Sequence, residues 1–495
     1  MGQAISAPKK SSDKLYYVWV VIGLFFIFIF GRVVPPFAGI DSVGVSIIGI
    51  FIGTLLMVSF GNMSFWPLLV AFIAMIDCGF STSGDLLTSW FGNTTIQMLI
   101  WLLAVTGAVA DSGAVQVLVY KLLSLKIIKG RPKTFLFILF IGFMFCALLL
   151  QASTALVILY LTIVDGICKA CDIEDDNELR RTMQLGVYNS VMGIYILPFK
   201  IVGALALAEA ALEPAGLAFD TGAYIITAGI IIVAIMLIYW AIVCFVWKPD
   251  MTKLKNFNFE DMNLKPEQKK LNRRQIIMLV LLLVGVVYLF ASTFAPAGGT
   301  IRAFTGKYGS VWIWVGLLAV MCIIRIDGKP MINGAKVMSD KVLWGIIAMA
   351  GCFSILGNCI ASDTHGIKTA IANLINNTIG TPSVFVLVLF SVVLTTVVTN
   401  LTSGFAASYP LLAICLPIAA TMQANGVISS ATPLATVIIA SSFFAYMTPG
   451  AIIYAPILLE KPGMTKKFIW TKGLLVVGIF IVLATAVGTI CSYIL

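Results

Sequence analysis

Apolar runs of about 20 residues recur along the whole sequence, and they constrain the fold more than any other feature. A helix of about 20 apolar residues is long enough to cross a hydrocarbon core about 30 Å thick. Hydrophobic residues make up 60% of the 495 residues and charged residues only 11%, whereas soluble domains carry about 25% charged residues. We therefore predict an all-α polytopic protein whose immediate partner is the lipid bilayer of the cell (plasma) membrane.

Eleven of these runs are predicted to be full transmembrane helices, and two further runs, 134–167 and 383–420, are interrupted in their middles. The full spans are expected near 15–33, 44–61, 63–78, 93–119, 184–210, 221–247, 275–297, 309–325, 342–374, 432–459 and 467–494.

The basic residues predict the orientation of these spans, because cytoplasmic loops are enriched in Lys and Arg. All the clusters fall on one side only if both interrupted runs are re-entrant hairpins that enter and leave by the same face. This places residues 1–14 in the cytoplasm and the C-terminus outside, with Arg302 and Lys307 as exceptions. The five basic clusters lie at 9–14, 121–133, 253–274, 325–341 and 461–472.

The remaining composition excludes several classes of function. The net charge of +10 resides in loops between spans, so no nucleic-acid partner is expected. His365 is the only histidine, and the ten cysteines show no metal or disulfide spacing. The sequence has no P-loop, so ATP-driven transport has no motif. We expect no enzyme, no cofactor and no metal beyond a sodium ion.

The polar linker 248–274 divides the chain into two membrane repeats, 15–247 and 275–495, whose features recur in the same order. "YNSVMGIYILPF" ends at Phe199 and "ASSFFAYMTPG" ends at Gly450, and at one offset Tyr195 matches Tyr446 and Pro198 matches Pro449. "QASTAL" and "TNLTSGF" match at nearly the same offset. An odd number of crossings separates equivalent points, so the repeats should be inverted, which is typical of secondary transporters.

Small polar residues at the predicted hairpin tips are the candidate binding groups. Irregular backbone within a membrane is tolerated where it lines a polar cavity or is buried in protein. Hydroxyl and amide groups there can coordinate ions without bulk, although Ser and Thr also serve helix packing in membranes. The tip residues are Gln151, Ser153 and Thr154 in the first repeat and Thr399, Asn400, Thr402 and Ser403 in the second.

The spans 184–210 and 432–459 are predicted to be broken at Pro198 and Pro449, because proline removes a helical hydrogen bond. The carbonyls freed at Tyr195, Ile196 and Tyr446 could then face an ion. Lys200 lies about two-thirds of the way along a span that we treat as otherwise uncharged. A charge within the membrane indicates a functional site, with snorkelling to the interface as the alternative.

This layout resembles the divalent anion/sodium symporters of the ion-transporter superfamily across nearly the whole chain. The resemblance implies a homodimeric secondary transporter that moves its hairpin-bearing domain by an elevator motion and carries di- or tricarboxylates with sodium. Members carry Ser-Asn-Thr at both tips, whereas this chain has Ala152-Ser153-Thr154 and Asn400-Leu401-Thr402.

The prediction is therefore a transporter of small organic anions, coupled to sodium ions or protons or working as an exchanger. The alternatives are a sodium/proton antiporter, an inorganic-anion permease of the sulfate type, and a channel or scaffold. Because the first tip lacks the asparagine, Lys200 is expected to replace a bound sodium ion or to pair with a substrate carboxylate. The candidate substrate-binding residues are Ser153, Thr154, Asn400, Thr402, Lys200, Pro198 and Pro449. The candidate cation-binding residues are Gln151, Ser153, Thr399, Asn400, Ser403, Thr448 and Gly450.

Overall fold

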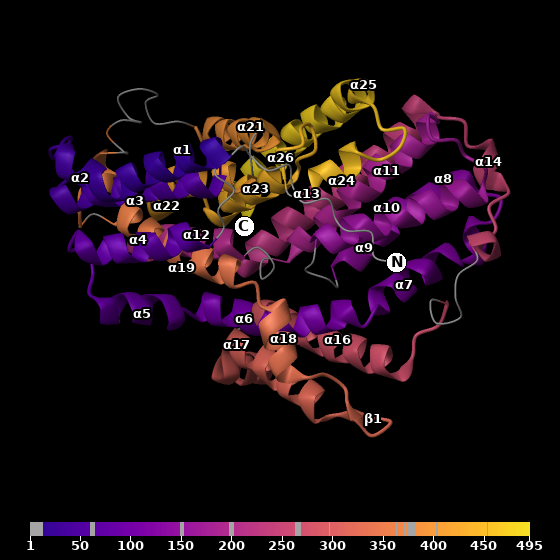
Figure 1. Cartoon of the computed structure of the whole chain (residues 1–495), viewed down its shortest axis with the longest axis horizontal. Coiled ribbons are helices and arrows are strands. Elements are labelled where there is room, and N and C mark those ends of the chain that lie inside the picture. The colour runs from indigo at the N-terminus through magenta and orange to yellow at the C-terminus, as the bar shows by residue number, and fades with distance from the viewer. Residues whose placement is uncertain are drawn as a thin grey trace.

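The computed structural model is built almost entirely of helices, which confirms the predicted fold class (Figure 1). In its described part, nine helices are long and apolar enough to cross a membrane, or ten if one bent pair counts as a single span. The chain thus has the architecture of a multi-pass helical membrane protein. The described residues are 13–59, 65–148, 153–197, 202–262, 269–296, 298–362, 364–370, 373, 383–401, 404–452 and 454–495.

The first three predicted spans each form one membrane element. They are α1 (Asp13–Leu24) with η1 (Phe25–Ile29) and α2 (Phe30–Val33), then α3 (Ser42–Ser59), then α4 (Trp66–Asp77). α3 packs closely on the first element because Gly49 and Gly53 let its backbone approach; a Cβ at Gly53 would lie 2.5 Å from the Gly23 carbonyl oxygen.

The single span predicted at 93–119 is wrong, because the chain there forms two helices. α6 (Thr94–Asp111) and α7 (Ala114–Leu123) are separated at Gly113, whose φ of 72° interrupts the helix. A left-handed backbone of this kind favours glycine. A short helix that was not predicted, α5 (Ser83–Phe91), precedes α6.

Each interrupted run forms a pair of helices. The first pair consists of α8 (Pro132–Phe137), η3 (Ile138–Gly142) and α9 (Phe143–Ala147) as one arm and α10 (Ser153–Ala170) as the other. The hydroxyl of Tyr160 in α10 donates to the carbonyl of Phe143 at 2.7 Å and joins the two arms. The second pair is α21 (Val384–Leu401) and α22 (Gly404–Ala424). We refer to these pairs as hairpin 1 and hairpin 2.

Both spans predicted to be broken are interrupted in the structure. α11 (Glu178–Ser190) continues as the 3₁₀ helix η4 (Val191–Ile196), Leu197 is extended, and α12 (Val202–Leu212) follows. In the second repeat, α23 (Thr432–Phe443) leads into a non-helical stretch before α24 (Ala455–Leu459). We call the stretches around 191–197 and 444–452 break 1 and break 2.

Two of the remaining spans have different bounds from those predicted. α17 (Thr300–Ile323) begins before the predicted start at 309, because the helix continues across Gly309, which has a φ of 65°. Tyr288 in α16 (Arg273–Phe294) donates to the carbonyl of Gly309 at 3.0 Å, which satisfies a group freed by this kink. α19 (Trp344–Ala361) ends well before 374, since Ser362 is already extended.

The other elements complete the two repeats. The β1 (Arg325–Ile326) and β2 (Lys329–Pro330) strands and α18 (Gly334–Lys341) join α17 to α19. The spans next to the broken helices are α13 (Thr221–Ala241) with η7 (Ile242–Trp247), and α25 (Lys466–Phe468) with η9 (Ile469–Gly473) and α26 (Leu474–Ile494). Short connecting helices are η2 (Lys126–Ile128), η6 (Glu213–Ala215), α14 (Thr252–Lys255) and η8 (Phe259–Met262).

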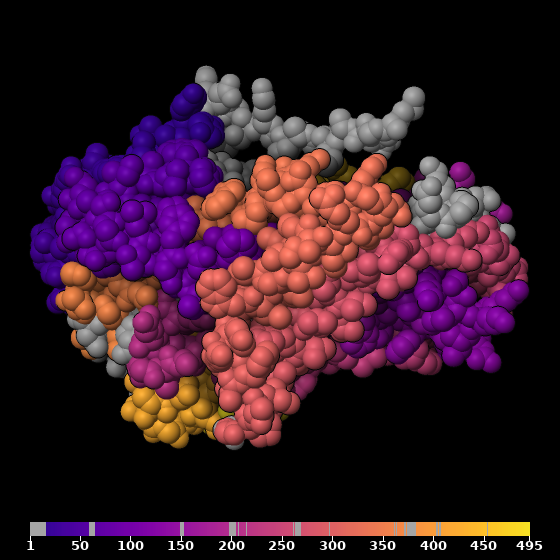
Figure 2. All heavy atoms as spheres, turned by 90° about the horizontal axis from the view of Figure 1, so that it is seen from below, coloured from indigo at the N-terminus to yellow at the C-terminus, as the bar shows by residue number. Residues whose placement is uncertain are grey.

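The two ends of the molecule's long axis are built from different parts of the chain. Figure 1 shows α2 to α5 at one end and α8, α11 and α14 at the other, with α12, α19 and α22 beside the first group. The helices α12 and α22 pack on α19, and α22 also contacts α3. Figure 2 shows α16 to α18 as a ridge across one face. The second half of the first broken span, α12, and the second arm of hairpin 2, α22, therefore meet helices that carry neither hairpins nor breaks.

Candidate functional site

The side chain of Asn400, at the end of the first arm of hairpin 2, is bonded directly to break 2. Its Oδ1 accepts from the backbone N–H groups of Tyr446 and Met447, each at 3.0 Å. Its Nδ2 donates to the carbonyls of Phe444 at 3.2 Å and Thr396 at 2.9 Å. One buried amide thus uses all four of its hydrogen-bonding positions on backbone groups.

Two further hydroxyl groups strengthen this junction. Thr399 Oγ1 donates to the carbonyl of Ser442 at 2.8 Å, and Thr448 Oγ1 donates to the carbonyl of Asn400 at 2.7 Å. Unpaired backbone groups are costly within a membrane, so these side chains make the unwound segment stable there. The structure therefore brings together Thr399, Asn400 and Thr448 as predicted, and in this conformation they hold the break.

Hairpin 1 contacts break 1 in a related way. The hydroxyl groups of Ser153, at the start of α10, and Tyr195, in η4, are joined by a hydrogen bond. Ser190 Oγ donates to the carbonyl of Phe140 in the first arm at 2.8 Å. A Cβ added at Gly193 would lie 2.1 Å from the Met144 carbonyl oxygen, so the break and the hairpin are in close backbone contact.

Among the described tip residues, Thr154 has the most available polar group. It is half-buried, and its hydroxyl forms no hydrogen bond within the described part of the chain. Pro449 and Gly450 in break 2 are exposed, and Thr448 is half-buried.

The carbonyl of Tyr195, which was predicted to face an ion, is already paired. The hydroxyl of Tyr224 in α13 donates to it at 2.8 Å. The expectation of a free carbonyl at Tyr195 is therefore wrong for this conformation, because a neighbouring helix supplies the missing donor.

Buried tyrosines connect the two breaks across the repeats. Tyr188 of α11 donates to the carbonyl of Ala445 at 2.7 Å, and the hydroxyl oxygens of Tyr195 and Tyr454 lie 3.3 Å apart. The ring of Tyr195 stacks on Phe443 with centroids 4.0 Å apart. The hairpin 1 tip, break 1 and break 2 consequently form one continuous cluster. Tyr188 and Tyr454 were not among the predicted site residues, and no charge or turn signal distinguishes them in the sequence.

Five predicted site residues lie outside the described residues: Gln151, Pro198, Lys200, Thr402 and Ser403. Their assignments stay predictions.

Ion pairs join the two repeats at the end of hairpin 1 opposite its tip. Asp165 of α10 lies 2.6 Å from Lys461 Nζ, which follows α24, and 3.1 Å from an Arg180 nitrogen. Glu178 pairs with Lys472, and Arg181 Nε donates to the carbonyl of Gly463 at 2.5 Å. We call this group the inter-repeat clasp. It ties hairpin 1 and α11 to the segments on either side of Gly463.

Sequence reasoning missed a carboxyl group in the first broken span. Glu209 of α12 lies within the apolar stretch "VGALALAEAAL", so treating this span as uncharged apart from Lys200 was wrong. Its Oε2 accepts a hydrogen bond from the hydroxyl of Thr95 in α6. An acidic residue within a predicted span is the signal that could have identified it.

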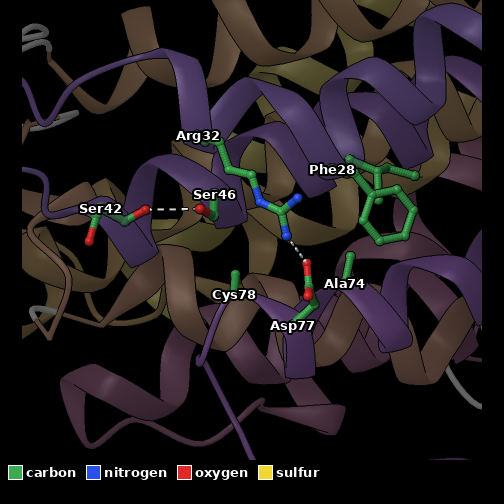
Figure 3. Close-up of a pocket in the computed structure, with 9 residues that line it drawn as sticks. Phe28, Arg32, Ser42, Ser46, Ala74, Asp77 and Cys78 are labelled. Atoms are coloured by element: carbon green, nitrogen blue, oxygen red, sulfur yellow. Dashed lines mark hydrogen bonds and ion pairs between the residues drawn. The ribbon is translucent and has the colours of Figure 1, made fainter.

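Away from the tips, a cavity of about 190 Å³ lies among η1, α2, α3 and α4 (Figure 3). Arg32 and Asp77 form an ion pair in it with 2.6 Å between nitrogen and oxygen. The Asp77 carboxylate already neutralises Arg32, so this cavity is a weaker anion site than its arginine alone suggests.

The span ends carry the other charged residues noted in the sequence. Asp111 pairs with Lys341 at 2.6 Å, and His365 pairs with Asp41 at 2.9 Å. None of the ten cysteines, all of which lie in the described residues, forms a disulfide. In the described part of the chain, no group of three or more His, Cys, Asp or Glu residues is placed to hold a metal ion.

The comparisons with known proteins identify a shared fold. No protein-family profile matches the sequence, and no curated protein matches it. The chain is similar to a solved structure of MtrF from Neisseria gonorrhoeae, which is described as illuminating a class of antimetabolite efflux pumps. The structural match covers 85% of this chain and 85% of the MtrF chain. The identity is 14% and the TM-score is 0.53, so the chain shares the overall fold of that protein.

Proposed function

We propose that the protein is a secondary active transporter of small organic anions, with di- and tricarboxylates as the substrate class. The observation that supports this most is the pairing of each hairpin with a broken helix, through Asn400 in one repeat and Ser153 in the other. Transporters built from inverted repeats bind their substrates where discontinuous helices meet.

The site would bind an anion mainly through backbone and hydroxyl dipoles. Helix N-termini carry partial positive charge. The helices α10 and α22 are the second arms of the two hairpins, so their N-termini follow the tips. The hydroxyl of Thr154, which has no hydrogen-bond partner among the described residues, is available to a substrate oxygen. Thr402 and Lys200 complete the proposed site as predictions from sequence, with Lys200 as the partner of a carboxylate.

The proposed transport step is an elevator motion of the hairpin-bearing part. The inter-repeat clasp and the tyrosine cluster tie hairpin 1 to both breaks, and Asn400 ties hairpin 2 to break 2, as a domain that moves as one unit requires. The resemblance to divalent anion/sodium symporters supports this motion, a homodimer and a cell-membrane location with a cytoplasmic N-terminus. Sodium ions or protons remain the proposed coupling ions.

The likeness to MtrF supports a second candidate, which is export of small organic molecules. Export differs from uptake in direction and uses the same site. Proteoliposomes loaded with substrate, under a proton gradient or a sodium gradient, distinguish export from uptake. An exporter moves substrate away from the cytoplasmic side when protons or sodium ions enter.

A thermal-shift screen in detergent tests the substrate class. Succinate, malate, citrate and sulfate are compared, each with and without sodium ions. We expect stabilisation by at least one carboxylate, and loss of that stabilisation in Lys200→Ala. Stabilisation by none of the four anions would contradict the proposal. Strict sodium dependence of uptake in the wild type, or full activity in Lys200→Ala, would exclude the compensating role of Lys200.

A further inference from the structure

Glu209 is a carboxyl group held between two packed helices and bonded to one hydroxyl. It lies on α12, and its Oε2 accepts from Thr95 Oγ1 at the start of α6. Its neighbours Leu207, Ala208 and Ala210 are fully buried. Leu207 and Ala210 pack against Gly357 of α19, where an added Cβ would lie 2.2 Å from the Leu207 side chain.

Among the described residues, the charged groups around Glu209 do not balance a negative charge. The helices packed on α12 are α6, α19 and α22, and η6 follows it. α19 and α22 contain no Asp, Glu, Lys, Arg or His, and the only one in α6 is Asp111 at the far end of that helix. The charged group that acts on Glu209 is Glu213 in η6, which has the same sign. Within the described residues Glu209 has no ion-pair partner.

A half-buried carboxyl group in this environment is suited to bind a proton. A charged side chain within a membrane is costly, and a proton removes that charge without requiring a cation. A protonated carboxyl group also needs an acceptor. On α19, which packs on α12, Oδ1 of Asn358 is a buried acceptor that has no hydrogen-bond partner among the described residues.

We propose that Glu209 is a proton-binding site that couples protonation to the movement of α12 against α6 and α19. This rests on the proposed function, since α12 belongs to the hairpin-bearing part and α6 and α19 do not. In the arrangement described, Glu209 holds one proton and contacts Thr95. As α12 moves away from Thr95, the carboxyl group reaches water, releases the same proton and becomes a carboxylate, so one proton crosses for each such cycle.

Infrared difference spectroscopy of the purified protein in detergent tests proton binding without any substrate. Spectra recorded between acidic and alkaline pH are compared for the wild type, Glu209→Gln and the control Glu213→Gln. We expect a band from a protonated buried carboxyl group that is absent in Glu209→Gln and retained in Glu213→Gln. A band that is absent from the wild type, or that persists in Glu209→Gln, would overturn the proposal.

Proteoliposomes with a pH-sensitive dye inside then test coupling, with succinate or citrate as the transported probe. Glu209→Gln should bind the probe and exchange it between the two sides, while proton movement falls to the level of empty liposomes. Thr95→Val should weaken proton coupling, and Thr95→Ser should restore it. Proton movement at the wild-type level in Glu209→Gln would exclude the coupling role. If no anion is transported at all, the proposed transport function is wrong, and the infrared spectra still test proton binding by Glu209 independently.

Discussion

The side-chain oxygen of Asn400 lies 3.0 Å from the backbone nitrogen of Tyr446, so one amide at the end of α21 holds the start of break 2. This contact joins a hairpin to the helix that it faces, 46 residues away along the chain. We expect it to stabilise the fold as well as to shape the site.

Asn400→Ala should lower the melting temperature of the purified protein in detergent markedly. The substitution leaves the Phe444 carbonyl and two backbone N–H groups without their partner, and each buried unsatisfied group costs about 1–3 kcal/mol. Asn425→Ala, at an exposed position after α22, is the control and should melt like the wild type. Equal melting temperatures for Asn400→Ala and the wild type would contradict a structural role for this amide.

Gly404→Ala should also destabilise the protein, by about 1–3 kcal/mol, which is typical of overpacking in a close-packed interior. The added methyl group would lie 2.4 Å from the carbonyl oxygen of Ser442, and a backbone atom cannot rotate away. Gly478→Ala in α26 is the matched control, because an added Cβ there meets no atom within 4 Å. Thermal melting of both variants distinguishes a local clash from a general intolerance of alanine.

Asp165→Asn should loosen the inter-repeat clasp. It removes the carboxylate shared by Lys461 and Arg180. Lys461, whose side chain is only 19% exposed, then loses its partner, while Arg180 keeps its pair with Asp175 at 2.5 Å. We expect a lower melting temperature, whereas Glu260→Gln in an exposed pair with Lys269 should have little effect because exposed pairs contribute about 0–1 kcal/mol. The double variant Asp165→Asn with Lys461→Gln should lose less stability than the two single variants together, and strict additivity would argue against a direct pair.

Stability should fall in acid through Asp41, in the loop between α2 and α3. Burial alone would raise the pKa of Asp41, but the Gly44 N–H and the hydrogen bond and charge of His365 together lower it below its usual value of 3.8. A lowered folded-state pKa contributes stability above the unfolded value, which is lost as the pH falls through the folded one. Melting curves from pH 7 to about pH 3 should therefore decline less steeply for Asp41→Asn than for the wild type. Parallel curves would show that this pair has no such role.

The sequence predicts the helices of this fold better than the hydrogen bonds between them. Hydrophobic run length predicts α13 and α26 almost to their bounds, and the internal match of "YNSVMGIYILPF" with "ASSFFAYMTPG" predicts both breaks. The break at Gly113 was missed because an isolated glycine within an apolar run is compatible with a continuous helix, and only its φ of 72° interrupts it.

The contacts that build the site could not be predicted, because they join segments far apart in sequence. Residue type alone suggests that Asn400 binds a substrate or a cation. Its actual hydrogen-bond partners depend on how hairpin 2 packs on break 2. Tyr224 likewise caps the Tyr195 carbonyl only because α13 lies beside η4. Glu209 was detectable as a charge in an apolar run, but its bond to Thr95 follows from the packing of α12 on α6.

Uptake of radiolabelled carboxylates into proteoliposomes tests the central claim most directly, with Thr154→Val compared against the wild type. Valine matches the shape of threonine and lacks only the hydroxyl, which forms no hydrogen bond within the described residues, so the variant should fold and melt like the wild type. We predict that the wild type accumulates at least one of succinate, malate and citrate, and that Thr154→Val transports it about tenfold more slowly, as expected for a loss of about 1.4 kcal/mol. Accumulation no greater than in empty liposomes, or wild-type rates in Thr154→Val, would contradict a transport site at the hairpin tips.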